Sequence, residues 1–245
     1  MNKIIDINCD VGEGFENEAE LMPYISSCSI ACGAHAGDVE TIIKTINLAL
    51  QYNVKIGAHP SFPDRANFGR KVLDIPINDL KRSLKAQIKL IKSNVEGLGG
   101  KLNHVKAHGA LYNLSANDRE TAKALIEVVK NTTNEVFLYV PYGSLIETLA
   151  NQNGLNTKVE AFADRNYNTN LTLVSRSEQN AVITDPELVA KHLMNIILDE
   201  HVISIDGVGV KMKAQTYCVH GDNSSAISIL KKVSKTLQEN GIKIV

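Results

Sequence analysis

Short runs of apolar, often β-branched residues alternate with longer stretches of helical periodicity from one end of the chain to the other. A strand that is followed by a helix and then by another strand returns to its sheet in the same direction, so this alternation predicts an α/β fold with a mainly parallel sheet. No linker or low-complexity segment interrupts the series. The predicted strands comprise residues 4–9, 28–32, 54–58, 102–107, 136–140, 158–163 and 217–220.

The longest helical pattern runs from Leu80 to Leu98, where apolar residues recur at intervals of three and four. Asn78 is its expected N-cap, and the helix is expected to end at the glycine-rich segment 97–100. Asp38 and Asp185 are expected to cap two further helices. The remaining helices are predicted over residues 18–25, 117–130, 143–152 and 222–238, and an alternating stretch at 201–215 predicts a hairpin.

Length and composition limit the class of protein. A chain of 245 residues suits one large α/β barrel or two smaller domains. The net charge of −1 offers no strong field for nucleic acid or for an anionic membrane, so neither is an expected partner. The apolar runs are shorter than the roughly 18 residues of a membrane span, and residues 1–6 turn acidic before a signal peptide could develop. We therefore expect a cytoplasmic protein, in which the four cysteines are buried thiols: Cys9, Cys28, Cys32 and Cys218.

Titratable side chains follow six of the predicted strands at their carboxyl ends. In parallel α/β folds the active-site groups come from this end, where the loops converge. Four of the seven histidines lie at the end of a predicted strand or within three residues after it, and are expected to share one pocket: His35, His59, His108 and His220. The other three lie within predicted strands or helices and are interpreted as structural or surface residues: His104, His192 and His201. The two longest loops, residues 60–76 and 165–180, are expected to be functional.

The residue types at these strand ends suit hydrolysis of an amide-like bond. A carboxylate or imidazole must activate water, and cationic or N–H donors must stabilise the developing oxyanion. Asp10 and the four histidines supply the first kind of group, and Lys106 and Arg165 supply the second. The same aspartate and histidines could equally bind a divalent metal ion that lowers the pKa of water. Because neither HExxH nor paired CxxC motifs occur, such a site would be assembled from separate strands.

The glycines after the first predicted strand do not form a nucleotide-binding motif. Gly12-Glu13-Gly14 lacks the third glycine of a dinucleotide fingerprint, and the sequence contains no GxxxxGK[ST]. We interpret Gly12 and Gly14 as turn residues with positive φ. Asp222, like Asp38, is expected to cap the helix that follows it. This chain is therefore not expected to bind ATP by itself.

Seven blocks of the sequence, taken in order, are more specific than any single motif above. They are DINCDVGEGF (6–15), IACGAHAGD (30–38), IGAHPSFPD (56–64), FGR (68–70), VKAHGALYN (105–113), EAFADRNY (160–167) and CVHGD (218–222). These blocks resemble the LamB/YcsF family, the A subunits of bacterial 5-oxoprolinase. The resemblance implies an α/β fold, an irregular seven-stranded (β/α) TIM-like barrel of the glycoside hydrolase/deacetylase type, with residues 1–245 as a single domain. That architecture agrees with the seven predicted strands.

The resemblance also implies an activity, the ATP-dependent hydrolytic ring opening of 5-oxo-L-proline (pyroglutamate) to L-glutamate. Two partner subunits, B and C, would use ATP as the co-substrate of the complex to activate the lactam carbonyl oxygen. This chain would direct water onto the activated carbon. The sequence's lack of a phosphate-binding loop is consistent with that division of labour.

Asp10 is the expected general base in this scheme, and the histidines are expected to position substrate, water or a metal ion. The expected catalytic residues are Asp10, His35, His59, Lys106, His108, Glu160, Asp164, Arg165 and His220. The expected substrate-binding residues are Asn8, Arg70, Tyr112 and Asp222. Should a divalent metal bind, its candidate ligands are Asp10, His35, His59 and His108. Kinship with deacetylases does not fix that ligand set, because the deacetylase motifs do not occur in this sequence.

Two other functions are alternatives. A metal-dependent deacetylase or amidase of carbohydrate or peptide substrates would use the same barrel and histidines, but would work without ATP or partners. A non-catalytic scaffolding subunit would tolerate substitution of Asp10 and of the strand-end histidines. We prefer the oxoprolinase function, because structural packing alone would fill so many converging positions with apolar residues.

Overall fold

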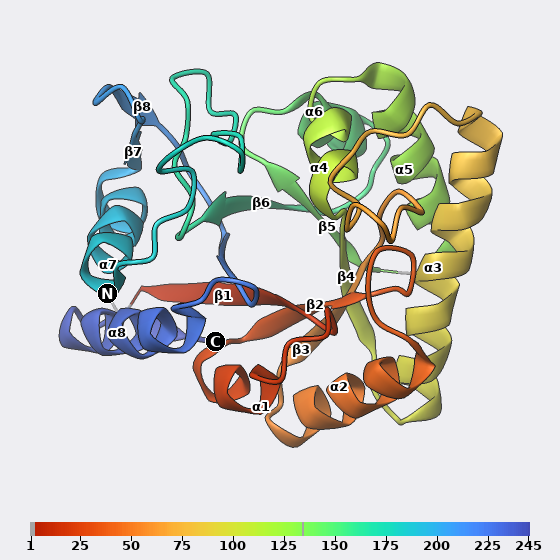
Figure 1. Ribbon diagram of the computed structural model, residues 1–245, viewed down its shortest axis with the longest axis horizontal. Coiled ribbons are helices and arrows are strands. Elements are labelled where there is room, and N and C mark those ends of the chain that lie inside the picture. Colours follow the sequence, from red (N-terminus) through yellow and green to blue (C-terminus); the bar gives the residue numbers. More distant parts are fainter. Residues whose placement is uncertain (1–2, 134) are drawn as a thin grey trace.

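Seven parallel strands close into a barrel in the computed structural model, which describes residues 3–133 and 135–245 (Figure 1). The N-terminal stretch considered above is therefore described only from residue 3. β1 pairs with β2 on one side and with β9 on the other, so the sheet has no free edge. The predicted seven-stranded α/β barrel is confirmed. Its strands are β1 (Ile4–Val11), β2 (Ser27–Ala31), β3 (Lys55–His59), β4 (Leu102–Lys106), β5 (Phe137–Pro141), β6 (Thr157–Phe162) and β9 (Thr216–His220).

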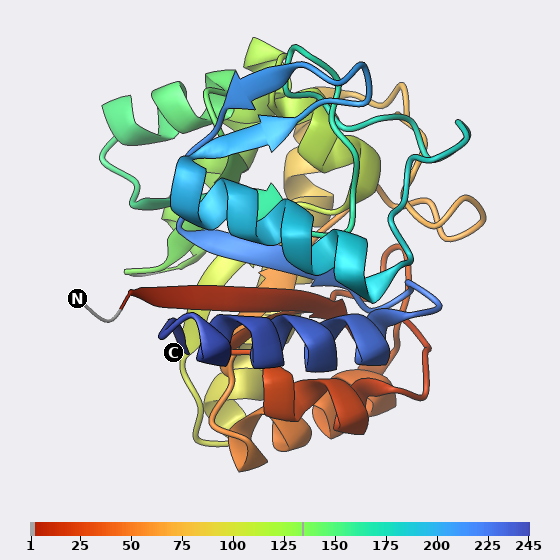
Figure 2. The ribbon, with the colours of Figure 1, turned by 90° about the vertical axis from the view of Figure 1, so that its left-hand side faces the viewer.

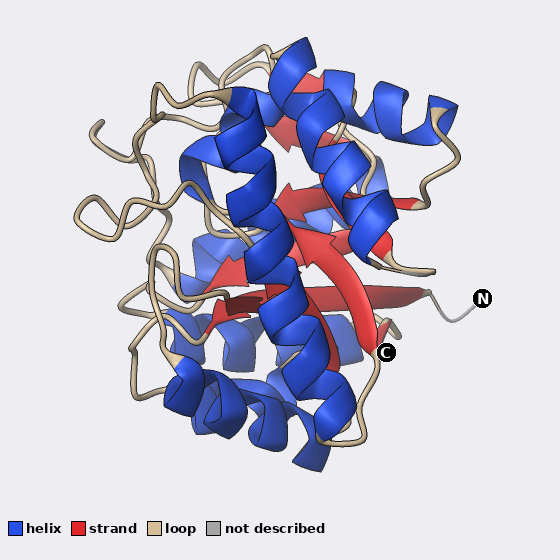
Figure 3. Ribbon diagram, turned by 90° about the vertical axis from the view of Figure 1, so that its right-hand side faces the viewer, coloured by secondary structure: helices blue, strands red, loops and turns tan. Residues whose placement is uncertain are grey.

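Helices cover the outside of the barrel, and the longest of them, α3, crosses the front of the view in Figure 3. Their bounds are α1 (Glu18–Leu21), α2 (Val39–Gln51), α3 (Ile77–Gly97), α4 (Gly109–Ser115), α5 (Arg119–Thr132), α6 (Leu145–Gln152), α7 (Pro186–Met194) and α8 (Ala226–Glu239). The apolar face of α3 is fully buried through Leu84, Ile88 and Ile91, and each such side chain contributes roughly 1.5–3 kcal/mol. None of the described helices is both long and apolar enough to cross a membrane.

The N-cap predictions were right at two helices and wrong at two. Asp38 and Asp185 each accept a hydrogen bond from a backbone N–H of the first helical turn, as predicted. Helix α3 starts one residue before Asn78, with Pro76 at the cap position, so Asn78 lies inside the first turn. Helix α8 starts well after Asp222. That carboxylate does not cap the helix, because arginines from two distant loops bind it.

Smaller elements surround the barrel. β7 (His201–Ile203) and β8 (Gly209–Lys211) form the antiparallel hairpin predicted within residues 201–215, seen at the top of Figure 2 above the paired helices α7 and α8. β10 (Lys243–Ile244) pairs in parallel with β1 and was missed, because two residues are too few to show a periodicity. The helix α4 was also missed, because its seven residues span only about two turns. All four cysteines are buried free thiols, as expected.

The interior of the barrel is polar. Asp6, Asn8 and Asp10 alternate along β1 and point inward, while the apolar residues between them join the core outside the barrel. Their partners show the direction: the Tyr139 hydroxyl of β5 donates to Asp6, and the Lys106 ammonium of β4 donates to Asn8 and Asp10. Because β4 and β5 lie across the barrel from β1, these contacts span its inside.

His104 of β4 lies in the middle of this interior, apart from the histidines at the strand ends. Its ring stacks on Tyr139 with 4.0 Å between centroids, and its Nε2 lies 3.1 Å from Ser29 Oγ. Gly57 leaves the necessary space, since a Cβ there would lie 2.1 Å from His104 Nε2. Burial lowers the pKa of His104 to about 3, although the nearby Asp6 acts in the opposite direction.

We expect the substitution His104→Asn to weaken the loss of stability in acid. The folded pKa of His104 lies below the unfolded value of about 6.5, so the unfolded state binds one more proton between these values and stability falls as the pH is lowered through 6.5. One such group lowers the free energy of unfolding by about 1.4 kcal/mol for each pH unit below 6.5. Urea unfolding at pH 7 and pH 5 should therefore show a decrease that is smaller in H104N, by up to about 2 kcal/mol.

His201→Asn is the matched control, because His201 is exposed on β7. H201N should keep the pH dependence of the wild type. If H104N lost as much stability between pH 7 and pH 5 as the wild type does, the buried neutral His104 would not contribute to the acid sensitivity.

Candidate active site

A cavity of about 320 Å³ opens at the carboxyl ends of the barrel strands, within the range of about 300–1,000 Å³ that small-molecule sites occupy. Figure 3 shows the long loops gathered at this end, toward which the strand arrows point. Nine of the residues singled out from the sequence line the cavity: Asp10, His59, Arg70, Lys106, His108, Tyr112, Arg165, His220 and Asp222. The other four lie outside its lining: Asn8, His35, Glu160 and Asp164.

Lys106 provides the central positive charge of the pocket floor. Its Nζ lies 2.9 Å from Asp10 Oδ1, 2.8 Å from Glu160 Oε1 and 3.2 Å from Asn8 Oδ1. Burial alone would disfavour the ammonium, but Asp10 and Glu160 hold the pKa of Lys106 well above its usual value. The anionic groups that Lys106 was expected to face are therefore the protein's own carboxylates.

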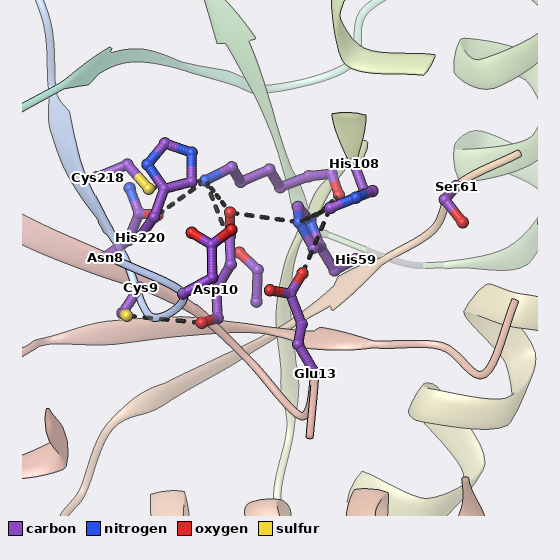
Figure 4. Close-up of polar contacts among 12 residues, drawn as sticks. Asn8, Cys9, Asp10, Glu13, His59, Ser61, His108, Cys218 and His220 are labelled. Atoms are coloured by element: carbon purple, nitrogen blue, oxygen red, sulfur yellow. Dashed lines mark hydrogen bonds and ion pairs between the residues drawn. The ribbon is translucent and has the colours of Figure 1, made fainter. Parts of the chain in front are cut away.

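Asp10 connects this ion cluster to the histidines. Its Oδ2 lies 3.3 Å from His59 Nε2 (Figure 4). Burial would raise the pKa of Asp10, but His59 and Lys106 together hold it well below the usual range. Asp10 therefore presents an ionised carboxylate to the pocket.

Three histidines from different strand ends gather beside Asp10. The rings of His35 and His108 stack with 3.8 Å between centroids, and His59 Nε2 lies 3.0 Å from His108 Nδ1. Burial lowers the pKa of His35 to about 3 and that of His108 well below its usual value, so both rings are neutral. Gly69 allows its loop to lie against these rings, because its φ is +63° and a Cβ would approach both His35 and His108 to 3.0 Å.

Glu13 is a site residue that the sequence analysis did not single out. Its Oε1 lies 3.2 Å from His35 Nε2. The same oxygen lies 3.4 Å from His108 Nδ1 (Figure 4). Burial, followed by the charge of Asp10, raises the pKa of Glu13 well above its usual value. Its position directly after the first strand was a usable signal, but the Gly-Glu-Gly segment was interpreted only as a turn.

His220 lies against the other side of Asp10 and is oriented by Asp164. The distance from His220 Nδ1 to Asp164 Oδ1 is 2.8 Å, and Asp164 also accepts a hydrogen bond from Asn223 Nδ2. Burial would raise the pKa of Asp164, but His220 lowers it below the usual value, so the carboxylate is an acceptor. Nδ1 of His220 consequently carries a proton, and Nε2 is the nitrogen left for chemistry in the pocket.

The rim of the pocket carries two arginines and one aspartate. Arg70 Nη2 and Arg176 Nη1 lie 2.5 and 2.9 Å from Asp222 Oδ2. The side chains of Arg70 and Arg176 keep 40% and 28% of their surface exposed, so part of each guanidinium stays available. Arg176 was not named individually, although it lies in the long loop 165–180 that was expected to be functional.

Other candidates have supporting positions. Asn8 donates to Glu160 Oε1 and Thr216 Oγ1 at 2.9 and 2.7 Å, so its amide holds the floor together and its position does not fit contact with substrate. Arg165 donates to two backbone carbonyls of its own long loop and thereby shapes the pocket wall. Tyr112 lines the pocket close to Glu160, and burial together with that carboxylate raises the pKa of Tyr112.

Known proteins resemble this chain over nearly its whole length. The model of the LamB/YcsF family matches residues 5–245. A protein from Geobacillus thermodenitrificans, named as the A subunit of 5-oxoprolinase, is 39% identical over 246 residues, covering 99% of this chain and 96% of the relative. A lactam utilization protein from Thermus thermophilus has a crystal structure that matches with a TM-score of 0.91 at 33% identity, covering 98% of both chains. A polysaccharide deacetylase from Bacillus cereus shares only the fold, with a TM-score of 0.53 at 10% identity over 99% of this chain and 90% of that one.

We expect Lys106→Met to be strongly destabilising, by about 3–5 kcal/mol, because Asp10 and Glu160 would stay buried without their counter-charge. The double variant Lys106→Met/Glu160→Gln should regain part of this loss, since one buried carboxylate is then removed. Urea unfolding of the wild type and both variants measures the differences.

Lys101→Met serves as the control. The Lys101 side chain is 77% exposed and pairs with Glu135 on the surface, so K101M should change stability by less than about 1 kcal/mol. Equal stabilities of K106M and K101M would contradict the central place given to the buried ammonium.

Proposed function

The chain belongs to the LamB/YcsF family, and we propose that it is the A subunit of a 5-oxoprolinase that opens 5-oxo-L-proline to L-glutamate in an ATP-dependent reaction with partner subunits B and C. The observation that carries the proposal is the 39% identity, across 99% of this chain, to the Geobacillus protein that is named as the A subunit of 5-oxoprolinase. The solved relative named a lactam utilization protein supports a lactam as the substrate class. The acid and base groups of the pocket support a hydrolytic role for this chain.

Opening the ring requires activation of the lactam, because the amide carbonyl carbon is a poor electrophile. In the proposed division of labour, subunits B and C use ATP to activate the carbonyl oxygen, and this chain adds water to the carbon. The sequence has no phosphate-binding loop of the GxxxxGK[ST] type, which agrees with ATP being handled by the partners.

The substrate carboxylate binds at the rim in this proposal. Arg70 and Arg176 share the single carboxylate of Asp222, which leaves one positive charge uncompensated. An arginine fork binds a carboxylate through two parallel hydrogen bonds and so fixes its orientation. With the carboxylate held at the rim, the lactam carbonyl is directed to the floor, where Asp10 is ionised.

Asp10 takes the proton of the attacking water, while the Lys106 ammonium at 2.9 Å holds the base in place. Because Lys106 and His59 hold the pKa of Asp10 low, this carboxylate is a weak base. A weak base suffices only when the carbon has already been made strongly electrophilic. The electrostatics of the floor therefore support a reaction that depends on prior activation of the lactam.

His220 serves as the acid for the leaving nitrogen. When the C–N bond breaks, the nitrogen must receive a proton, and Nε2 of a protonated His220 can supply it. Asp164 holds Nδ1 at 2.8 Å and stabilises the positive ring, in the way a buried carboxylate orients a catalytic histidine. Base and acid thus line the same pocket.

We expect glutamate from 5-oxo-L-proline only when this chain, both partner subunits and ATP are all present. Asp10→Asn should lower the rate of the complete mixture at least about 100-fold, because an amide cannot accept the proton of water. Glutamate release is measured with each component omitted in turn and with the variant in place of the wild type.

Asp118→Asn is the control variant, since Asp118 caps α5 and does not line the pocket. A D10N enzyme that kept nearly the wild-type rate would remove Asp10 as the base. Absence of glutamate from the complete wild-type mixture, with all subunits folded, would overturn the proposed function and direct assays to acetylated sugars.

Arg176→Gln should raise KM for 5-oxo-L-proline at least about 10-fold and change kcat much less, because a charge-assisted hydrogen bond contributes about 1.5–3 kcal/mol to binding. Steady-state kinetics of the reconstituted complex separate the two constants. Arg82→Gln is the control, as Arg82 is 76% exposed on α3. An unchanged KM in R176Q would show that the substrate carboxylate binds elsewhere.

A further inference from the structure

Two histidines at the mouth of the barrel have one ring nitrogen each bound to a backbone carbonyl. His59 Nδ1 lies 2.8 Å from Lys106 O, and His108 Nε2 lies 2.8 Å from Phe68 O. A carbonyl oxygen only accepts hydrogen bonds, so both of these nitrogens carry a proton. In the neutral rings, His59 Nε2 and His108 Nδ1 are therefore unprotonated, each with a free lone pair.

These two lone pairs face each other at 3.0 Å. Glu13 Oε1 lies 3.4 Å from His108 Nδ1, and Asp10 Oδ2 lies 3.3 Å from His59 Nε2 (Figure 4). Asp10 Oδ2 accepts a hydrogen bond from the Lys106 ammonium, but with neutral rings and an ionised Glu13 the other three atoms are acceptors with no donor among them. Such a group of buried acceptors is stable only when positive charge is placed between them, as added protons or as a cation.

The spacing of the atoms fits a cation. Ligand bonds to Zn²⁺ of about 2.0–2.2 Å in a tetrahedral arrangement keep the ligand atoms roughly 3.3–3.6 Å apart. The ligand atoms of Glu13, His59 and His108 all lie within 4.8 Å of one another. Their side chains are only 4%, 1% and 8% exposed, so the group is shielded from bulk water.

The surroundings of these residues also match those of metal ligands. A histidine that binds a metal usually donates its second ring N–H to a carbonyl or carboxylate, which fixes the tautomer, and both rings do so here. His35 lies beside Glu13: its Nε2 lies 3.2 Å from Glu13 Oε1, and its Nδ1 lies 3.0 Å from the hydroxyl of Ser61. That hydroxyl donates to the Phe62 carbonyl, so His35 Nδ1 carries the proton, and the unprotonated Nε2 is one more acceptor that faces Glu13.

We propose that Glu13, His59 and His108 bind one divalent transition-metal ion of the Zn²⁺ type at the mouth of the barrel, with Asp10 beside it. Two imidazoles and one carboxylate are a common ligand set of catalytic zinc, which keeps a further position open for water. An ion bound there would make a bound water more acidic. The ligand set differs from the sequence expectation, because Glu13 takes the place of His35. The proposal does not rest on the reaction proposed above.

The test is metal binding by the full, tag-free chain after treatment with a chelator, with Zn²⁺ or Co²⁺ alone as the probe. Calorimetry should show one equivalent of Zn²⁺, Co²⁺ should give the visible absorption of a low-coordinate N/O site, and Zn²⁺ should raise the melting temperature. Glu13→Gln and His108→Asn should each lower the affinity at least about 10-fold. None of these three measurements requires substrate or partner subunits. Failure of the metal proposal is therefore distinguishable from failure of the oxoprolinase function.

His201→Asn is the matched control, because that exposed histidine is remote from the cluster and its loss should leave Zn²⁺ affinity unchanged. Circular dichroism of the metal-free proteins establishes that the variants are folded. If H108N does not fold, E13Q decides alone, since glutamine keeps the size of glutamate. A folded wild type that binds no Zn²⁺ at micromolar concentration, or an E13Q variant that binds it as tightly as the wild type, would overturn the proposal.

Discussion

The buried ammonium of Lys106 is the interaction on which the rest of the site depends. It lies inside the barrel within 3.2 Å of Asp10, Glu160 and Asn8, which come from other strands of the barrel. Removing such charges from water costs several kcal/mol each, so the arrangement is stable only while every partner keeps its place. The pairing therefore connects β1, β4 and β6 across the inside of the barrel. It also keeps Asp10 ionised at the floor of the pocket.

The architecture could be predicted because its strands and long helices each have a local pattern of apolar residues. Each barrel strand is a short apolar run and each long helix repeats its apolar residues at helical spacing, and both patterns survive in a single sequence. What could not be predicted depends on contacts between distant segments. Asp222 has the residue type of an N-cap, yet arginines from two separate loops bind it, so α8 starts later than expected. Pro76, and not Asn78, stands at the N-cap of α3, and the fixed φ of proline suits the start of a helix.

The position of the candidate site could be predicted from the sequence, but the pairing of its charged side chains could not. The rule that strand ends converge located many of the titratable residues that line the pocket, and the family resemblance supplied a reaction. A sequence does not show which partner a charge takes: Lys106 pairs with the protein's own carboxylates, and Arg165 binds backbone carbonyls of its loop. Arg176 lies within a long loop, where no strand-end argument reached it, whereas Glu13 follows the first strand but was interpreted only as part of a turn.

The floor of the pocket has an excess of negative charge, and the rim has an excess of positive charge. The floor holds three buried carboxylates and one ammonium: Asp10 and Glu160 pair with Lys106, and Glu13 lies against His35 and His108. Burial, followed by the charge of Asp10, raises the pKa of Glu13, so protonation of Glu13 reduces the excess of negative charge; a bound divalent ion would reduce it without protons. The rim has the reverse imbalance, with two arginines on one aspartate. This opposition of charge supports the proposed binding mode, in which the carboxylate of an anionic lactam would bind at the rim and its uncharged ring would approach the floor.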